Sequence, residues 1–458
     1  RYKYSMKFFF RHILIFLQVF FSAIYFAQGP VKVEIMNEGE KWQLIREGKP
    51  YYIKGAGGSV YMDQMVAYGA NSLRTWGAER AGEILDEAQK HGLTVMLGLW
   101  VQHERHGFDY DNKNKVQKQL NDFREIVLKY KDHPALLLWG VGNEVDLNYA
   151  NTKVWDAIND IAKMIHELDP NHPTSTVTAG LDSVEVALIN KKAPHIDIYG
   201  INTYADINYV KDNIRKFGWN GPYMITEWGP TGHWESPTTE WGFSIEATSS
   251  QKLKIYQERF DKFIYSDQEK CLGSYAFLWG QKQEYTNSWY GLFTAKGEPT
   301  ETLDALHYCW KREIPFMKAP SVDSLLIDGK NVSQSVYLKP GEMYEASIKA
   351  FCNSCDKIKY DWSVRQESSD LKTGGDVESE PDELIGIIKK RNQYAVRLKA
   401  PESEGAYRLF VSVKGNDKVA YANFPFYVLP RNPSEKQKQF VKFKTQTLDS
   451  FYGEVEGK

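Results

Sequence analysis

Eight short apolar segments, each followed by a polar loop and a helical pattern, dominate the chain between residues 51 and 314. The helical stretches include 78–92 and 155–169. Eight strands alternating with helices over about 260 residues have the size and order of a (β/α)₈ TIM barrel, an α/β fold. A doubly wound open sheet is the alternative, but no Gly-rich phosphate-binding fingerprint follows any segment. The expected strands are 51–57, 71–76, 93–100, 135–144, 174–179, 196–202, 222–227 and 274–280.

The segments on either side of this region have different patterns. Residues 28–50 alternate and contain turn signals, which predicts an N-terminal β-hairpin. After a linker at 315–320, residues 321–430 consist of short alternating strands without helices, which predicts an accessory β-sandwich of immunoglobulin-like type. Within it, residues 367–383 form an acidic stretch that we expect to be an exposed loop. Residues 431–458 are polar and predict a surface strap or a tail.

Residues 1–27 indicate a targeting segment. Lys7 and Arg11 precede the apolar run 13–27, which is the pattern of a secretory signal peptide and is short for a spanning helix. Tyr25 stands where a small residue is expected before the cleavage site, so an uncleaved anchor is the alternative. The pattern predicts a secreted, periplasmic or cell-surface protein with no stable membrane insertion beyond this segment.

The charge balance argues against a nucleic-acid partner. The chain has 57 basic and 59 acidic side chains, a net charge of −2. Removal of residues 1–27 takes away four basic residues and no acidic ones, and so leaves about −6. Neither value provides a basic surface for phosphates. Aromatic residues make up 14% of the chain, which suits a sugar-binding cleft and equally suits large cores. Nothing in the sequence calls for a cofactor, and we expect a monomer or weak oligomer.

The four cysteines are disulfide candidates because export would place them in an oxidising compartment. Cys352 and Cys355 are close enough in sequence to close a tight turn. Cys271 precedes the eighth expected strand and Cys309 lies late in the last barrel helix, so both fall at the same end of a barrel. A disulfide between Cys271 and Cys309 is one interpretation, and two separate buried thiols are the other.

Polar and aromatic residues gather where the expected strands end. In a TIM barrel these ends form one face, which carries the active site. A buried strand that ends in a carboxylate needs a partner or a task for that charge. The bland alternatives are structural carboxylates paired with Arg74, packing indoles, and ordinary loop side chains. The candidates are Arg74, Trp76, Trp100, His103, Asn143, Glu144, Asn202, Tyr204, Glu227, Trp228, Trp279 and Gln281.

Glu144 and Glu227 end the fourth and seventh strands, on opposite sides of the barrel mouth. Two facing carboxylates are what acid–base cleavage of a glycosidic bond requires: one protonated to donate to the leaving oxygen, the other ionised to attack the anomeric carbon. Arg74 would hold one glutamate ionised, and the indoles would stack on sugar faces. His103 and His106 are a possible metal pair, but no third ligand is specified, so no metal is expected.

These motifs resemble the clan A glycoside hydrolases, especially family-2-type barrels and β-1,3-glucanosyltransferase-like barrels. The resemblance rests on GNE at 142–144, TEWG at 226–229 and Arg74, and it extends to the stretches 42–55 and 277–303. It covers roughly residues 42–312. It implies a retaining enzyme with a covalent glycosyl intermediate.

The resemblance also implies residue roles. Glu144 corresponds to the acid/base of the clan and Glu227 to its nucleophile. Asn143 would hold the sugar 2-hydroxyl group. Arg74 and Tyr204 would support the nucleophile.

We therefore expect a secreted retaining O-glycosidase that acts on a polysaccharide or oligosaccharide, with β-glucan, in particular β-1,3-linked glucan, as the substrate suggested by analogy. A transglycosylase using the same residues is one alternative, and a non-catalytic carbohydrate-binding surface protein is another. In the long loop after the seventh strand, Trp234, Glu240 and Trp241 are candidates to wall the cleft, since such loops carry specificity.

Overall fold

The computed structural model describes residues 30–431. The targeting segment and almost all of the predicted tail lie outside these residues. No helix within the described part of the chain is long and apolar enough to cross a bilayer. The chain divides into two compact units, which we describe separately. Unit 1 contains the chain up to Trp228 together with Asp261–Phe277, and unit 2 contains Gly229–Phe260 together with the chain from Leu278 onward.

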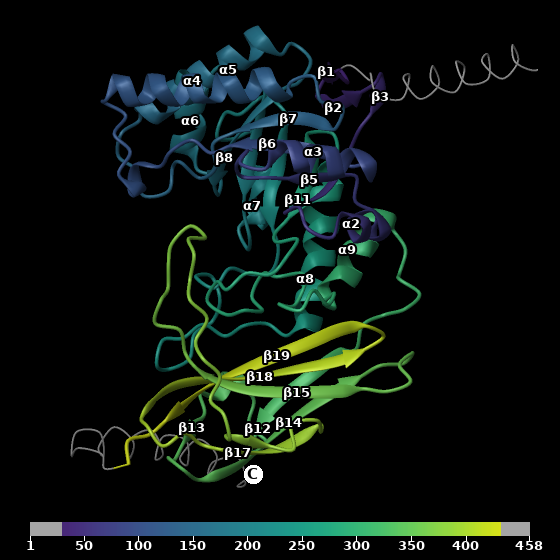
Figure 1. Ribbon diagram of the computed structural model, residues 1–458, viewed down its shortest axis with the longest axis vertical. Coiled ribbons are helices and arrows are strands. Elements are labelled where there is room, and N and C mark those ends of the chain that lie inside the picture. The colour runs from purple at the N-terminus through teal and green to yellow at the C-terminus, as the bar shows by residue number, and fades with distance from the viewer. Residues whose placement is uncertain (1–29, 432–458) are drawn as a thin grey trace, which may run out of the picture. The chain divides into compact units, whose positions relative to one another are not determined.

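Unit 1 contains a closed barrel of eight parallel strands, so the predicted TIM barrel is confirmed. The strands follow one another around the barrel in chain order, and β11 closes it by pairing with β4. Figure 1 shows the strands flanked by helices. The barrel strands are β4 (Ile53–Gly57), β5 (Ser72–Arg74), β6 (Thr94–Leu99), β7 (Leu136–Val141), β8 (Thr174–Ala179), β9 (Ile198–Asn202), β10 (Tyr223–Trp228) and β11 (Cys271–Ala276).

The barrel forms because its strands are buried on both faces. Every residue of β6 (TVMLGL) and β7 (LLLWGV) is buried, the near-continuous apolar pattern of parallel strands covered by helices. Helix α5 carries a wide apolar face that buries eight residues, whereas α4 is more polar. The helices of unit 1 are α2 (Met62–Tyr68), α3 (Ala81–Lys90), η1 (Glu104–His106), α4 (Lys113–Tyr130), α5 (Lys153–Leu168), α6 (Ser183–Lys192), α7 (Ile207–Asn213) and η3 (Tyr265–Asp267).

A small sheet precedes the barrel and closes one of its ends. It consists of β1 (Val33–Glu38), β2 (Lys41–Arg46) and β3 (Lys49–Pro50), in that order. Val33 and Leu44 join the core cluster that contains Ile53, the first residue of β4, and Leu272, near the start of β11. The sheet therefore covers the end where the strands begin, and the end where they finish is left for the site.

The last barrel strand lies three residues earlier than expected. The chain leaves the barrel after Ala276, and the Leu278 backbone pairs with Tyr290 and Leu292 instead. Cys271 is consequently the first residue of β11.

Of the two interpretations of Cys271 and Cys309, the structure has the second: both are buried free thiols, and they form no disulfide. The Cys271 thiol lies 3.4 Å from the Gly273 carbonyl, and the Cys309 thiol lies 3.9 Å from the Tyr256 carbonyl. Each thiol is thus directed at a different backbone oxygen.

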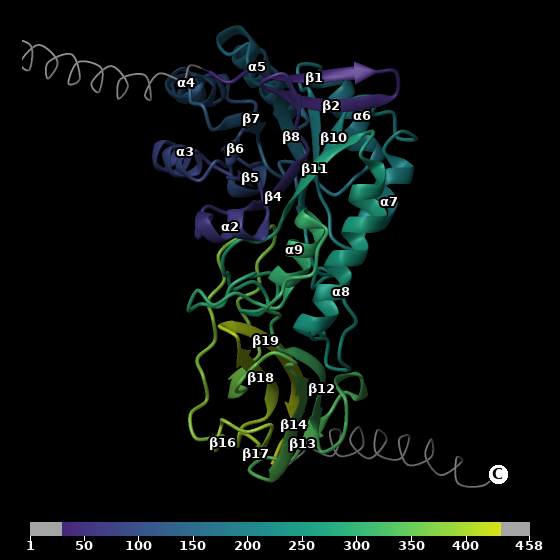
Figure 2. The ribbon, with the colours of Figure 1, turned by 90° about the vertical axis from the view of Figure 1, so that its right-hand side faces the viewer.

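Unit 2 contains the α-helices α8 and α9 and a β-sandwich, which Figure 2 labels. Helix α8 begins with a capping box formed by Thr248 and Gln251. It is followed by a π-helical turn at Phe260–Ile264. The elements of unit 2 are α8 (Ser249–Arg259), α9 (Thr302–Lys311), β12 (Ser321–Ile327), η4 (Val332–Gln334), β13 (Tyr337–Leu338), β14 (Met343–Phe351), β15 (Lys359–Gln366), β16 (Ile388–Lys389), β17 (Ala395–Lys399), β18 (Gly405–Gly415) and β19 (Lys418–Val428).

The sandwich has the strand order of an immunoglobulin domain. One sheet has the order β12-β14-β17-β16 and the other β13-β19-β18-β15, with β13 parallel to β19. If β12 to β19 are named A, A′, B, C, D, E, F and G, the sheets become A-B-E-D and A′-G-F-C, which is the immunoglobulin arrangement. Trp362, Leu398 and Phe424 are among the fully buried residues between the sheets. The predicted immunoglobulin-like sandwich is confirmed. Its CxxC pair, Cys352 and Cys355, forms the expected disulfide.

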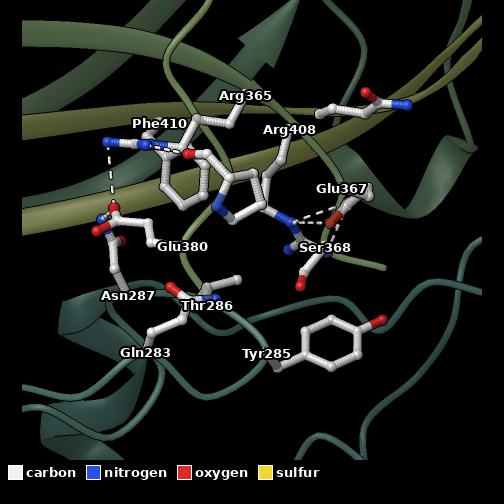
Figure 3. A pocket seen from close by; sticks show the side chains of 12 residues that line it. Gln283, Tyr285, Thr286, Asn287, Arg365, Glu367, Ser368, Glu380, Arg408 and Phe410 are labelled. Carbon is white, nitrogen blue, oxygen red and sulfur yellow. Dashed lines mark hydrogen bonds and ion pairs between the residues drawn. The ribbon is translucent and has the colours of Figure 1, made fainter. Parts of the chain in front are cut away.

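The acidic loop at 367–383 is less exposed than expected. Glu367 and Glu378 are buried, because each has a partner within unit 2. Arg408 binds Glu367 through two nitrogens, and Glu378 accepts the backbone N–H of Tyr285 at 2.7 Å. Figure 3 shows the pocket at the base of this loop, with Arg408 bonded to Glu367 and Glu380 joined to neighbouring side chains. Although the sequence of this loop is rich in acidic residues, not all of its acidic side chains are exposed to solvent.

Candidate active site

Arg74 is the centre of a hydrogen-bond network at the ends of the barrel strands. It ends β5 and is 1% exposed. One terminal nitrogen donates to the Thr226 carbonyl at 2.7 Å, to Glu227 Oε1 at 3.1 Å and to Asn202 Oδ1 at 3.3 Å. The other donates to Asn143 Oδ1 at 2.6 Å. One guanidinium thus joins the ends of β5, β9 and β10. It also binds Asn143, which follows the end of β7.

The Glu227 carboxylate is surrounded by hydrogen-bond donors. Trp76 Nε1 donates to Oε1 at 2.7 Å, and the Tyr204 hydroxyl donates to Oε2 at 3.3 Å. Arg74 adds a charged bond, and its guanidinium lies 5.4 Å from the centre of the Trp76 ring. Glu227 is itself 6% exposed. Three donors thus point at this one side chain, which is the arrangement that orients a carboxylate by hydrogen bonds.

Glu144 occupies a different environment. Its φ is +48°, in the left-handed region that non-glycine residues seldom adopt, and its N–H donates to the Val177 carbonyl at 2.9 Å. One oxygen accepts Asn202 Nδ2 at 2.8 Å. Burial raises the pKa of Glu144 to about 8, the negative charge of Glu227 adds to this, and the Asn202 hydrogen bond opposes it. Glu144 is therefore the carboxyl group of the two that holds a proton at neutral pH.

The two glutamates share one cation. Burial lowers the pKa of Arg74, and the charges of Glu227 and then Glu144 oppose this effect. The contact with the guanidinium is made by Glu227, at 3.1 Å. One positive charge thus faces two carboxyl groups, and Glu227 is the one that forms the ion pair with it.

His103 lies directly beside this network. Its Nε2 is 2.6 Å from the Asn143 carbonyl, which makes it the protonated nitrogen of the ring. The ring is 1% exposed and packs against half-buried Trp100 at 4.7 Å and against His106 at 5.2 Å. Within residues 30–431, no group of three metal-ligating side chains lies close enough to hold an ion. His103 thus fixes the backbone next to Glu144.

Two residues of the network escaped the sequence reasoning. The Thr226 hydroxyl donates to Asn202 Oδ1 at 2.8 Å, in addition to the role of its carbonyl. Phe277 packs edge-on against Trp76 at 5.9 Å and against Tyr204 at 6.3 Å. Thr226 precedes a predicted site residue, which is a usable signal. Phe277 falls inside the expected strand 274–280, so the sequence pattern does not show that it follows the end of a strand.

Three predicted substrate contacts lie outside the network described above. Trp228 is fully buried in unit 1. In unit 2, Trp279 is 1% exposed and packs against Phe293 at 5.1 Å and Trp310 at 6.1 Å. Gln281 Nε2 donates to a backbone carbonyl of the next turn at 3.4 Å. Both tryptophans have packing roles, and contact between these three residues and a sugar stays a prediction.

A barrel with two glutamates and an arginine at its strand ends has the groups that cleavage of a glycosidic bond requires. The sequence model of the TIM barrel domain of glycosyl hydrolases family 2 matches residues 62–312, more than half of the chain. The chain therefore belongs to glycosyl hydrolase family 2.

The chain is similar to several proteins whose names are those of glycosidases. It is 26% identical over 183 residues to a β-glucuronidase of Chlorocebus aethiops, a match covering 35% of this chain and 26% of that protein. It is 24% identical over 146 residues to a mannan endo-1,4-β-mannosidase F of Aspergillus clavatus, covering 28% and 34%.

Among solved structures, it resembles a Faecalibacterium prausnitzii β-glucuronidase, with a TM-score of 0.48 and 19% identity over 62% of this chain and 53% of that one. The chain thus spans about a quarter to a third of these curated relatives and about half of this structural neighbour.

Proposed function

We propose that this protein is a retaining β-glycosidase, with Glu144 as acid/base and Glu227 as nucleophile. One observation carries the proposal: the two carboxyl groups occupy opposite environments. Glu227 accepts bonds from a cation, an indole and a phenol, whereas burial raises the pKa of Glu144 to about 8. This split assigns the proton to one carboxyl group and the charge to the other.

The reaction would take place in two steps. In the first, Glu144 donates its proton to the glycosidic oxygen while a Glu227 oxygen attacks the anomeric carbon, so that the C–O bond to the leaving group breaks and a glycosyl ester forms. In the second, ionised Glu144 takes a proton from water, whose oxygen displaces Glu227. The anomeric carbon is inverted twice, which retains its configuration. A sugar hydroxyl that replaces water would give transglycosylation.

The substrate is open to direct test. The names of the relatives suggest β-glucuronides and β-mannans, and the predicted β-glucan belongs beside them. Export, which residues 1–27 predict, is also part of the proposal. In this mechanism Asn143 and Asn202, which both accept hydrogen bonds from Arg74, would bind a sugar hydroxyl next to the reacting carbon.

The test uses wild-type protein and Glu227→Ala. Both would be supplied with aryl β-glucuronide, β-glucoside, β-mannoside and β-galactoside, and with β-glucan, mannan, galactan and xylan. We expect wild type to release product from at least one of these and Glu227→Ala to release none. NMR of the first product would show the retained anomer. Inverted product, or turnover by Glu227→Ala at the wild-type rate, would overturn the proposal. Binding without turnover by either protein would indicate a non-catalytic carbohydrate-binding protein.

A further inference from the structure

The loop between β10 and α8, residues 229–248, is fastened to the sandwich inside unit 2. At the tip of its turn, Trp241 packs against Tyr337 at 5.3 Å and against Tyr427 at 5.8 Å. Next to it, Glu240 accepts the Tyr337 hydroxyl at 3.0 Å. Two of the three loop residues considered as cleft walls, Glu240 and Trp241, are thus used to anchor the loop.

A second anchor lies further along the loop. The Ser244 carbonyl accepts Arg408 at 2.9 Å, and the Ser244 N–H donates to the Tyr285 hydroxyl at 2.6 Å. Buried Glu246 accepts Lys252 Nζ at 2.6 Å. Buried charged contacts of this kind hold the loop in one conformation.

The first part of the loop, residues 232–235, is held by an aromatic stack. His233 lies parallel to Tyr285, with ring centres 4.9 Å apart and planes 20° apart. Its edge contacts Trp289 at 6.0 Å. Because Tyr285 and Trp289 pack against each other at 5.1 Å, the imidazole has little freedom.

Trp234 lies in the same part of the loop, and its indole faces solvent. It is 59% exposed. It lies over Gly232, where an added Cβ would come within 2.7 Å of two indole carbons, and it contacts the edge of His233 at 5.0 Å. Glu235 accepts the Gly232 N–H at 2.9 Å and fixes that backbone. One side of the indole is therefore seated on the backbone, while much of its surface remains open.

We propose that Trp234 is a stacking platform for a pyranose ring of an extended carbohydrate substrate. The C–H face of a pyranose is apolar and flat, and a fixed indole offers a matching surface at little cost in side-chain entropy. Trp234 follows Glu227 by seven residues in the sequence, in the loop that comes after β10, and loops of this kind carry specificity. The inference rests on the proposed function and deepens it, because it selects oligosaccharides and polysaccharides over monosaccharide conjugates.

The first test compares two kinds of substrate in the full chain. Trp234→Ala should raise KM for the polysaccharide or oligosaccharide that wild type cleaves by roughly three- to tenfold, with kcat unchanged. KM for the corresponding aryl monoglycoside should stay the same. Gly232→Ala should shift KM in the same direction because its methyl group displaces the indole. Tyr394→Ala removes another aromatic residue, 67% exposed on the sandwich, and should change neither KM.

A second measurement does not depend on turnover. Wild type and Trp234→Ala would be run in native gels that contain barley β-glucan, galactomannan, arabinoxylan or glucuronoxylan. We expect at least one polysaccharide to retard wild type and Tyr394→Ala, and to retard Trp234→Ala less. Equal migration of all three proteins in every gel would overturn the platform, as would a Trp234→Ala enzyme with wild-type KM on the long substrate. Inactive wild type that is nevertheless retarded through Trp234 would instead sink the proposed glycosidase activity.

Discussion

Buried charge is arranged differently in the two units. In unit 1, Arg74 faces two carboxyl groups, Glu144 and Glu227. In unit 2, Lys252 faces Glu246, with side-chain exposures of 1% and 0%, and the Arg408–Glu367 pair is nearby in the same unit. Lys252 and Arg408, the two buried cations of unit 2 named here, thus each have one carboxylate as ion-pair partner, whereas buried Arg74 in unit 1 faces two carboxyl groups.

This difference in charge count has a chemical consequence. Burial raises the pKa of Glu246, but the charge of Lys252 and its hydrogen bonds bring that pKa below its ordinary value. Burial raises the pKa of Glu144 to about 8, and the neighbouring Glu227 adds to the rise. The Lys252–Glu246 pair is balanced, and its lowered glutamate pKa favours an ionised, structural pair. An excess carboxyl group holds a proton near neutral pH and is able to donate it.

The largest expected effect concerns the balanced pair. Lys252→Met leaves Glu246 buried without its cation and should lower the free energy of unfolding by about 3–5 kcal/mol. Lys252→Met combined with Glu246→Gln should recover much of that loss. Urea denaturation monitored by tryptophan fluorescence measures both. Activity per folded molecule should be retained, and a loss of activity without a loss of stability would erase the distinction between the two clusters.

The site with one cation and two carboxyl groups, Arg74 with Glu144 and Glu227, should determine the pH dependence of the reaction. In the proposed mechanism Glu144 acts in its protonated form. Because burial raises its pKa to about 8, kcat/KM should fall about tenfold per pH unit above that value. The charge of Asp146 contributes to the raised pKa, so Asp146→Asn should move this alkaline limb to lower pH by less than about one unit. Initial rates between pH 5 and 10 test both statements. A limb that moves upward in the variant would contradict the electrostatic account.

A substitution in a solvent-exposed ion pair should have almost no effect on the free energy of unfolding. It therefore serves as the reference for the buried pair. Lys118 and Asp122 form a 2.6 Å ion pair on α4, with side-chain exposures of 76% and 56%. Asp122→Asn should change the free energy of unfolding by less than about 0.5 kcal/mol, because solvent screens the pair. The same urea titration measures it. A change as large as that of Lys252→Met would mean that burial is not what separates these pairs.

The alternation of apolar strands predicted the barrel because each strand is buried on both faces, as β6 and β7 show. It misplaced β11 by three residues, since LWG at 278–280 is as apolar as a strand but pairs with 290–293.

Strand ends located Arg74, Asn143 and Glu227 because parallel strands finish on one face. They did not decide whether Trp279 would stack on a sugar or pack between aromatic rings, or whether Cys271 and Cys309 would be bridged or be directed at separate carbonyls. Such contacts depend on side-chain directions, which the sequence pattern does not specify.

The division of the chain into two units also bears on which segments can be exchanged by recombination during evolution. Unit 2 begins at Gly229, two residues after Glu227, and not at the linker near residue 315. Within it, Asn423 of the sandwich donates to Glu246 of the loop that follows β10, and Arg408 donates to Ser244 of the same loop. A recombination event that exchanged the sandwich alone would leave these loop groups without their donors. The sandwich and the loop after β10 should therefore pass between lineages together, as one exchangeable module.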